Sequence, residues 1–246
     1  MFLYIPALLQ TILFAVVLKA VSLFDNFFWF LLFFLLFISL IGARIVIRNW
    51  LLWYSIGLFS VSSWVMLHLI DYSPERNIFI FLSSLVYYFF LFGGYRINKN
   101  KEDEVSRGII AMVLMATVFL FLSATHGIYL NFELSSWWLM LFYFANIFII
   151  SYRYFAFIET KKKNLVMVYS LVMGFAMLEM GWVVNFWPFG YLTSGFVMLM
   201  FYYILWDLSR DYFSGSLSKK TVLINLILFM IISGMVLFSS KWLLQF

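Results

Sequence analysis

Long apolar runs separated by short polar clusters are the feature that most constrains the fold of this chain. A run of about 20 apolar residues is long enough, as a helix, to cross the hydrocarbon core of a bilayer. The runs cover residues 3–23, 26–43, 50–70, 77–95, 108–129, 134–152, 165–186, 190–209 and 221–243. Because a helix satisfies its own backbone hydrogen bonds in lipid, we predict an all-α, polytopic transmembrane helical bundle of about nine spans, forming a single membrane domain over residues 1–246.

Composition supports the membrane class and excludes several kinds of site. Hydrophobic residues make up 65% of the chain and charged residues 11%, whereas a soluble domain is roughly half apolar and a quarter charged. The chain has no cysteine, which excludes disulfides, thiolate metal sites and a cysteine nucleophile. The first apolar run lacks the basic start and the small-residue cleavage site of a signal peptide, so we expect it to be retained as a span.

The basic residues predict the orientation of the spans. If the N-terminus is cytoplasmic, 13 of the 16 basic residues fall in the inner loops, as the positive-inside rule requires. They are Arg44, Arg48, Arg96, Lys99, Lys101, Arg107, Arg153, Lys161, Lys162, Lys163, Arg210, Lys219 and Lys220. We therefore predict a cell (inner or plasma) membrane protein with a cytoplasmic N-terminus, an external C-terminus and outward-pointing hairpins. The net charge of +5 then indicates anionic lipid head groups at the inner loops, and not nucleic acid.

Two of the hairpins share a ladder of an arginine, a histidine, a glutamate and a second arginine. The ladders are Arg48, His68, Glu75 and Arg96, then Arg107, His126, Glu133 and Arg153. The pattern is consistent with internal duplication, which many transporters show. A bilayer of fixed thickness would also space the inner arginines evenly. Internal duplication and the thickness of the bilayer are therefore both open as explanations of the pattern.

His68 and His126 are the only histidines, and both fall near the outer end of a span. Each histidine could form an acid–base pair with the glutamate that follows it, Glu75 or Glu133. Together the two histidines could ligate a haem iron or another metal. The simpler interpretation is that each histidine lies at head-group depth and bonds its own helical turn, so we expect no cofactor.

Glu179 is the most informative single residue, because it lies in the outer half of the run 165–186. A carboxylate at this depth costs a few kcal/mol unless it is protonated or paired. Its helical neighbours, Trp182 among them, include no cation, so a partner must come from another helix, from water or from a bound proton. The candidate partners are His68, His126, Asn146 and Gln10. We interpret Glu179 as a substrate- or proton-binding residue, with a protonated structural contact between helices as the alternative.

The segment that follows Glu179 is typical of a hairpin turn at the membrane surface. Trp187 and Tyr191 are the amphipathic aromatic residues found at head-group depth, and Pro188 fixes the turn. Small residues four apart allow helices to approach closely. Two such pairs, Ser170 with Gly174 and Gly190 with Ser194, predict close packing of the seventh and eighth spans.

Asp207 and Asp211 stand four residues apart, on one face of a helix at the inner end of the eighth span. Two carboxylates so spaced can share Mg²⁺ and hold a diphosphate. Over this one turn the pair resembles the aspartate pair of intramembrane prenyltransferases of the UbiA type. Those enzymes have a second Asp-rich motif, and the nearest candidate here, residues 100–104, has a different spacing. The default interpretation is a juxtamembrane pair neutralised by Arg210.

Three classes of function fit these features. The first is a non-enzymatic accessory, scaffold or lipid-interacting membrane component, with a membrane protein partner or a second copy of the chain beside it. The second is a transporter or channel for a small or lipid-like substrate, built around Glu179. The third is a lipid-modifying enzyme that uses Asp207 and Asp211. We favour the first, because few polar groups interrupt the spans and no known catalytic motif is present.

Overall fold

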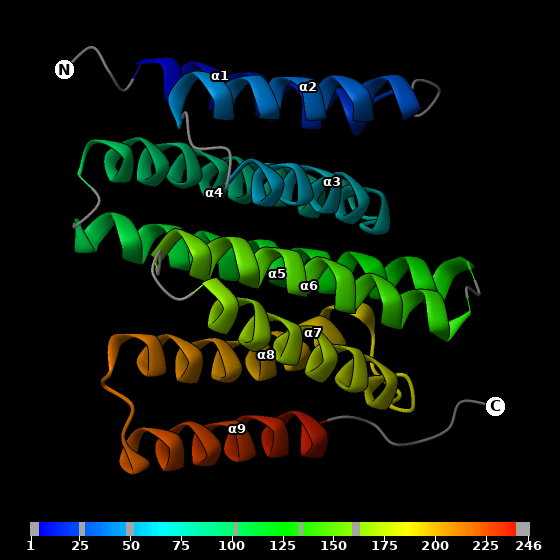
Figure 1. Ribbon diagram of the computed structural model, residues 1–246. Helices are drawn as coiled ribbons and strands as arrows, with labels where there is room; N and C mark the ends of the chain where they lie inside the picture. Colours follow the sequence, from blue (N-terminus) through cyan, green and yellow to red (C-terminus); the bar gives the residue numbers. More distant parts are fainter. Residues whose placement is uncertain are drawn as a thin grey trace. The chain divides into compact units, whose positions relative to one another are not determined.

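The computed structural model describes residues 5–24, 28–47, 52–100, 103–132, 135–158 and 163–239. These residues form nine α-helices and no strand (Figure 1). The helices are α1 (Ile5–Val21), α2 (Phe28–Val46), α3 (Trp53–Leu69), α4 (Ser73–Lys99), α5 (Glu104–Phe132), α6 (Ser136–Ile158), α7 (Lys163–Val184), α8 (Tyr191–Ser214) and α9 (Lys219–Ser239). The expected all-helical bundle is thus confirmed.

Each helix occupies one of the predicted apolar runs, and several extend beyond the run into polar sequence. α4 starts at Ser73, ahead of its apolar run, with Pro74 in its first turn and Glu75 beside it. Proline suits the start of a helix, and an acidic side chain there interacts favourably with the helix dipole. By length and composition, α2, α4, α5, α6, α7 and α8 can cross a membrane. Several transmembrane helices are therefore supported, while the count of nine spans stays a prediction.

The chain divides into two compact units, Met1–Ala124 and Thr125–Phe246, and the division falls inside α5. The first unit holds α1 to α4 with the first part of α5, and the second holds the end of α5 with α6 to α9. That both units fold as one membrane domain stays a prediction.

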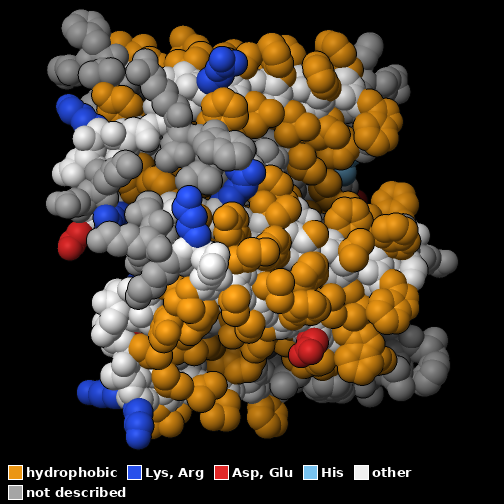
Figure 2. All heavy atoms as spheres, viewed as in Figure 1, with side chains coloured by type: hydrophobic (Ala, Val, Ile, Leu, Met, Phe, Trp, Pro, Cys, Tyr) orange, Lys and Arg blue, Asp and Glu red, His pale blue; other side chains and the backbone are white. Residues whose placement is uncertain are grey.

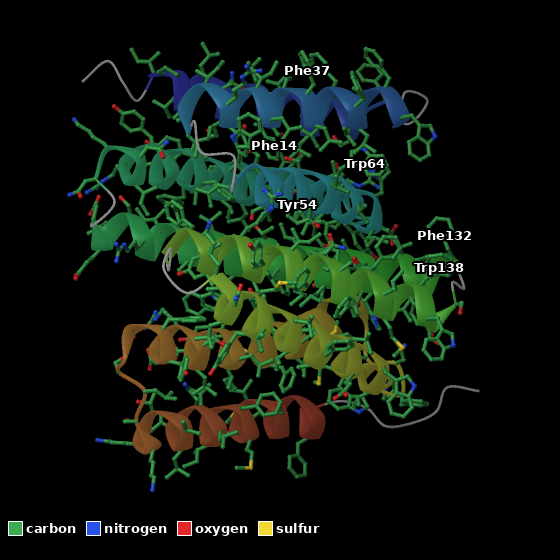
Figure 3. All side chains as sticks on the ribbon, in the orientation of Figure 1. Phe14, Phe37, Tyr54, Trp64, Phe132 and Trp138 are labelled. Atoms are coloured by element: carbon green, nitrogen blue, oxygen red, sulfur yellow. The ribbon has the colours of Figure 1, made fainter. Side chains whose placement is uncertain are left out.

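In the first unit, α1, α2, α3 and α4 pack on one another around aromatic side chains. Phe14 of α1 is fully buried. Its ring stacks on Tyr87 of α4, with ring centroids 4.4 Å apart, and faces Phe59 of α3 at 6.0 Å. In Figure 3, Phe14 lies between the pair α1 and α2 and the pair α3 and α4, whereas Phe37 points outward from α2. Aromatic rings from three helices therefore meet inside a core whose other buried side chains are mostly aliphatic.

In the second unit, α6 and α7 make the most extensive helix–helix contact. A Cβ atom added at Gly174 of α7 would lie 3.1 Å from the Phe144 carbonyl oxygen of α6, so any larger residue would require the two helices to separate by a few tenths of an ångström. Ser170 is also buried, which confirms the close packing predicted from this pair. The Gly190–Ser194 prediction is half wrong, because Ser194 is buried but nothing lies within 4 Å of a Cβ built at Gly190. Gly190 directly precedes α8 as its N-cap residue and is exposed.

Large hydrophobic side chains cover much of the surface, as Figure 2 shows for one face. On α2 the exposed ones include Trp29, Phe30, Phe33 and Phe37, each more than half exposed. Apolar surface of this extent requires lipid or another protein to cover it. The surface therefore agrees with a membrane-embedded chain.

Candidate functional site

Glu179 lies on the exposed side of α7, five residues before the helix ends. The side chains around it are also exposed: Val172 by 55%, Phe175 by 49% and Trp182 by 52%. Trp182 packs edge-on against Phe186, with ring centroids 5.1 Å apart. Glu179 and Trp182 therefore belong to one surface stripe of α7, which is otherwise apolar.

We expected Glu179 to be paired with a side chain of another helix, with water or with a bound proton, and the structure corrects the first of these within the described ranges. No hydrogen bond or ion pair reaches its carboxylate there from His126, Asn146 or any other side chain. The physical reason is the orientation of α7, whose small and slender residues Ser170, Gly174, Met177 and Gly181 are buried. At 3.6 residues per turn, Glu179 points about 140° away from Gly174. The spacing of the small residues could have predicted this outward direction.

His68, at the end of α3, is bonded to its own helix. Its Nδ1 lies 2.9 Å from the Trp64 carbonyl oxygen, and its ring centroid is 4.7 Å from that of Trp64. This agrees with the simpler interpretation of an exposed histidine that bonds its own turn.

His126, on α5, differs from His68 because it is buried, with 2% of its surface exposed. Its ring lies 5.8 Å from that of Tyr129, and its Nδ1 atom has no hydrogen-bond partner among the described residues. Glu133, the expected acid–base partner, lies outside the described residues. The paired ladders and the acid–base hypothesis therefore stay predictions.

Asn146 of α6 was proposed as a partner for Glu179. Its Nδ2 instead donates a hydrogen bond of 2.8 Å to the Phe142 carbonyl oxygen, one turn earlier on the same helix. Gln10, the other amide considered, has a buried Oε1 with no hydrogen-bond partner in the described chain, and this atom faces Gly42 of α2.

Asp207 and Asp211, near the end of α8, both face Arg210 at 3.6 Å. Asp207 also accepts a hydrogen bond of 2.9 Å from Asn225 of α9. Within the described residues, no group of three or more histidine, aspartate or glutamate side chains could hold a metal ion. A metal–diphosphate role for the two aspartates stays a prediction, while their contacts agree with the default of charges neutralised by Arg210.

Basic side chains gather at one end of each unit. In the first unit, Ile47 after α2 lies against Gly94 of α4, so the basic ends of α2 and α4 adjoin. In the second unit, Tyr169 of α7 stacks on Tyr212 of α8 at 5.0 Å, which joins the start of α7 to the end of α8. The basic residues at these ends are Arg44, Arg96, Lys99 and Arg107 in the first unit, and Lys163, Arg210, Lys219 and Lys220 in the second.

Asp103 organises the basic end of the first unit, in the link between α4 and α5. Its Oδ2 accepts hydrogen bonds from Ser106 at 2.5 Å and from Arg96 Nε at 2.9 Å. The Ser106 bond, and then the charge and the bond of Arg96, hold the pKa of this carboxyl below its usual value. The lowered pKa favours the ionised form of Asp103, which holds the Arg96 guanidinium in place.

Sequence reasoning missed the polar contacts inside the two units. Ser60 Oγ donates to Ser39 Oγ at 2.8 Å and links α3 to α2, while the Tyr87 hydroxyl of α4 reaches the Ser39 carbonyl oxygen at 3.4 Å. In the second unit, the hydroxyls of Ser151 and Tyr202 lie 3.2 Å apart and link α6 to α8. The only available signal was the number of serines within residues 53–69, because hydroxyls commonly join helices in membranes.

The comparisons with known proteins identify a family. Residues 26–239 match a family model whose description is "Protein of unknown function (DUF5656)". Neither the curated proteins nor the solved structures yield a match. Since the matched residues span most of the sequence, the chain belongs to the DUF5656 family.

Proposed function

We propose that this protein is a non-enzymatic accessory component of the cell membrane, with nine spans and a cytoplasmic N-terminus, whose basic end binds anionic lipid head groups. The observation that carries the proposal is the gathering of basic side chains at one end of each unit. Lysines and arginines at the ends of apolar helices lie near the membrane surface, where each one attracts anionic lipid by about 1 kcal/mol. The positive-inside rule assigns that end to the cytoplasm and leaves the C-terminus outside.

The interior contacts support an accessory role over the two alternatives. A transporter built on Glu179 would need this carboxylate beside an internal path, whereas Glu179 is exposed on α7. A lipid-modifying enzyme built on Asp207 and Asp211 would need those carboxylates for a metal ion, whereas both face Arg210. The described contacts favour a structural use of the polar groups.

Lipid selectivity tests the proposal. The protein is reconstituted into bilayers, and electron spin resonance of spin-labelled phosphatidylglycerol and phosphatidylcholine measures the relative affinity of each lipid for the protein surface. Lys219 and Lys220, both exposed at the start of α9, are replaced together by glutamine. At about 1 kcal/mol for each lysine, the preference at the affected lipid sites should fall by about fivefold per charge.

The matched control is Lys19→Gln. Lys19 lies at the opposite end of the first unit, where its Nζ donates to Asn77 Oδ1 at 2.7 Å. This control should leave the preference unchanged, and about 1 M salt should abolish the preference of the unmodified protein by screening. If the Lys219→Gln, Lys220→Gln variant keeps its full preference for phosphatidylglycerol, the lipid-binding proposal is refuted.

A further inference from the structure

Glu179 is a single carboxylate on the exposed, otherwise apolar surface of α7. The exposed stripe includes Val168, Val172 and Phe175 below Glu179, and Trp182 and Phe186 beyond it. The stripe runs along most of α7 (Lys163–Val184), so it presents a surface on which a second helix could lie. Glu179 is the only charged side chain in it.

The position of Glu179 along α7 sets the depth of the charge. Five residues separate it from the end of the helix at Val184, which is about 7 Å at 1.5 Å per residue. A carboxylate at that depth is destabilised in hydrocarbon unless it is protonated or meets an opposite charge or a hydrogen-bond donor. In the part of the chain that the structure describes, no side chain bonds to it. A cation on another protein at the same depth would stabilise its ionised form.

We propose that the exposed Glu179 stripe of α7 is a docking surface for a transmembrane helix of another protein, one that carries an arginine or lysine at the depth of Glu179. Charge complementarity selects this partner, because a cation at matching depth neutralises the carboxylate while the apolar stripe packs along the rest of the helix. A second copy of this chain would instead bring two carboxylates of the same sign together. The inference gives the proposed accessory role a partner and rests on that role.

The test uses a synthetic helix as the probe. The peptide has about 20 leucine and alanine residues, uncharged ends and one arginine five residues from its outer end; a second peptide has leucine in place of the arginine. The full chain is labelled with a donor fluorophore at a cysteine introduced by Gly190→Cys, since the chain has no other cysteine and a Cβ at Gly190 meets nothing within 4 Å. Energy transfer to an acceptor on the peptide measures association in vesicles of phosphatidylcholine.

The arginine peptide should associate with the labelled protein more tightly than the leucine peptide. Glu179→Gln should remove this difference and weaken binding of the arginine peptide by roughly three- to thirtyfold, the range for a polar contact between transmembrane helices. Because Glu179 is exposed and bonds to no described side chain, this substitution should leave the fold intact.

A second variant moves the carboxylate along α7 and should change which peptide the protein prefers. The double variant Glu179→Leu, Phe175→Glu moves the carboxylate one helical turn, or about 6 Å, deeper along the same exposed stripe. This variant should prefer a peptide whose arginine lies four residues deeper, while the unmodified protein prefers the original peptide. A shift of this kind cannot arise from a general loss of stability.

Three results would overturn the inference. The first is equal binding of the arginine and leucine peptides by the unmodified protein, or a Glu179→Gln variant that binds the arginine peptide as tightly as the unmodified protein does. The second is a register variant that keeps the original preference. The third is Glu179-dependent energy transfer between donor- and acceptor-labelled copies of the protein, which would assign the stripe to self-association. Because the vesicles carry no net charge, failure of the lipid-binding proposal would leave all three measurements unaffected.

Discussion

The contact of α7 with α6 at Gly174 makes a quantitative prediction for Gly174→Ala. The new Cβ would lie 3.1 Å from both the carbonyl oxygen and Cδ2 of Phe144, and 3.2 Å from Cβ of Phe148. An ordinary contact of this kind is 3.4–4 Å, so α6 and α7 must separate by a few tenths of an ångström. A carbonyl oxygen and a Cβ atom cannot rotate away, so the whole helix must move. Such overpacking costs about 1–3 kcal/mol.

Alanine also favours a helix over glycine by about 1 kcal/mol, and this gain partly hides the packing cost. Gly108→Ala separates the two effects, because Gly108 is in α5 and a Cβ there meets nothing within 4 Å. Gly108→Ala should be neutral or stabilising, and Gly174→Ala should be less stable than it by about 1–3 kcal/mol. The measurement is the free energy of unfolding in mixed micelles titrated with sodium dodecyl sulfate. If the two variants agree within about 0.5 kcal/mol, the close approach of α6 and α7 is wrong.

The remaining predictions concern polar contacts. Ser60→Ala removes the 2.8 Å bond to Ser39 and should lower the free energy of unfolding by about 0.6 kcal/mol, the average for such bonds in membranes. Asn225→Leu removes the 2.9 Å bond to Asp207 and should speed hydrogen exchange in α9, measured by mass spectrometry. Asp103 has a lowered pKa, so its stabilising effect is complete above the ordinary carboxyl range near pH 4 and is lost as the pH falls through the folded-state pKa. Asp103→Asn should therefore reduce the steepness of acid unfolding.

Each of these three has a matched comparison. Ser84 bonds only the carbonyl oxygen of Ile80 on its own helix, at 2.7 Å, so Ser84→Ala should cost less than Ser60→Ala. Hydrogen exchange in α6 should stay constant in the Asn225 variant, and unchanged exchange in α9 would contradict the role of that bond. Ser106→Ala keeps the Asp103 carboxyl but removes the bond that lowers its pKa most, so it should also reduce the steepness of acid unfolding. An Asp103→Asn variant whose acid unfolding is as steep as that of the unmodified protein would contradict the pKa argument.

The positions of the helices could be predicted from the apolar runs of the sequence, whereas hydropathy alone did not show which side each helix buries. Apolar runs located the nine helices of the described residues, since a helix that crosses a bilayer must be apolar over most of its length. The same property removes the contrast between faces that orients a helix in a soluble protein. Glu179 was therefore assigned to the right helix, but the side chains proposed as its partners do not reach it within the described residues. The small residues Ser170 and Gly174 held the missing information, because they identify the buried side of α7.

Contacts between distant segments were also beyond the sequence. Nothing in the run 221–243 indicated that Asn225 would bond Asp207, because that contact depends on α9 packing against α8. The local hydrogen bond of Asn146 to its own helix was equally hidden, because an amide in a span can bond either its own backbone or a neighbouring helix.

The buried hydroxyls also bear on how the protein assembles. Ser39, Ser84, Thr117 and Ser209 each donate to the carbonyl oxygen four residues earlier, at 2.7 to 2.8 Å. A hydroxyl group that donates to its own helix leaves no unsatisfied donor in the hydrocarbon, so it adds little to the cost of inserting that helix alone. Each helix can then insert into the bilayer first, and the inserted helices associate in a second step. Each of these hydroxyl oxygens can still accept a hydrogen bond from a neighbouring helix when the helices pack together. Ser39 Oγ accepts such a bond from Ser60 Oγ.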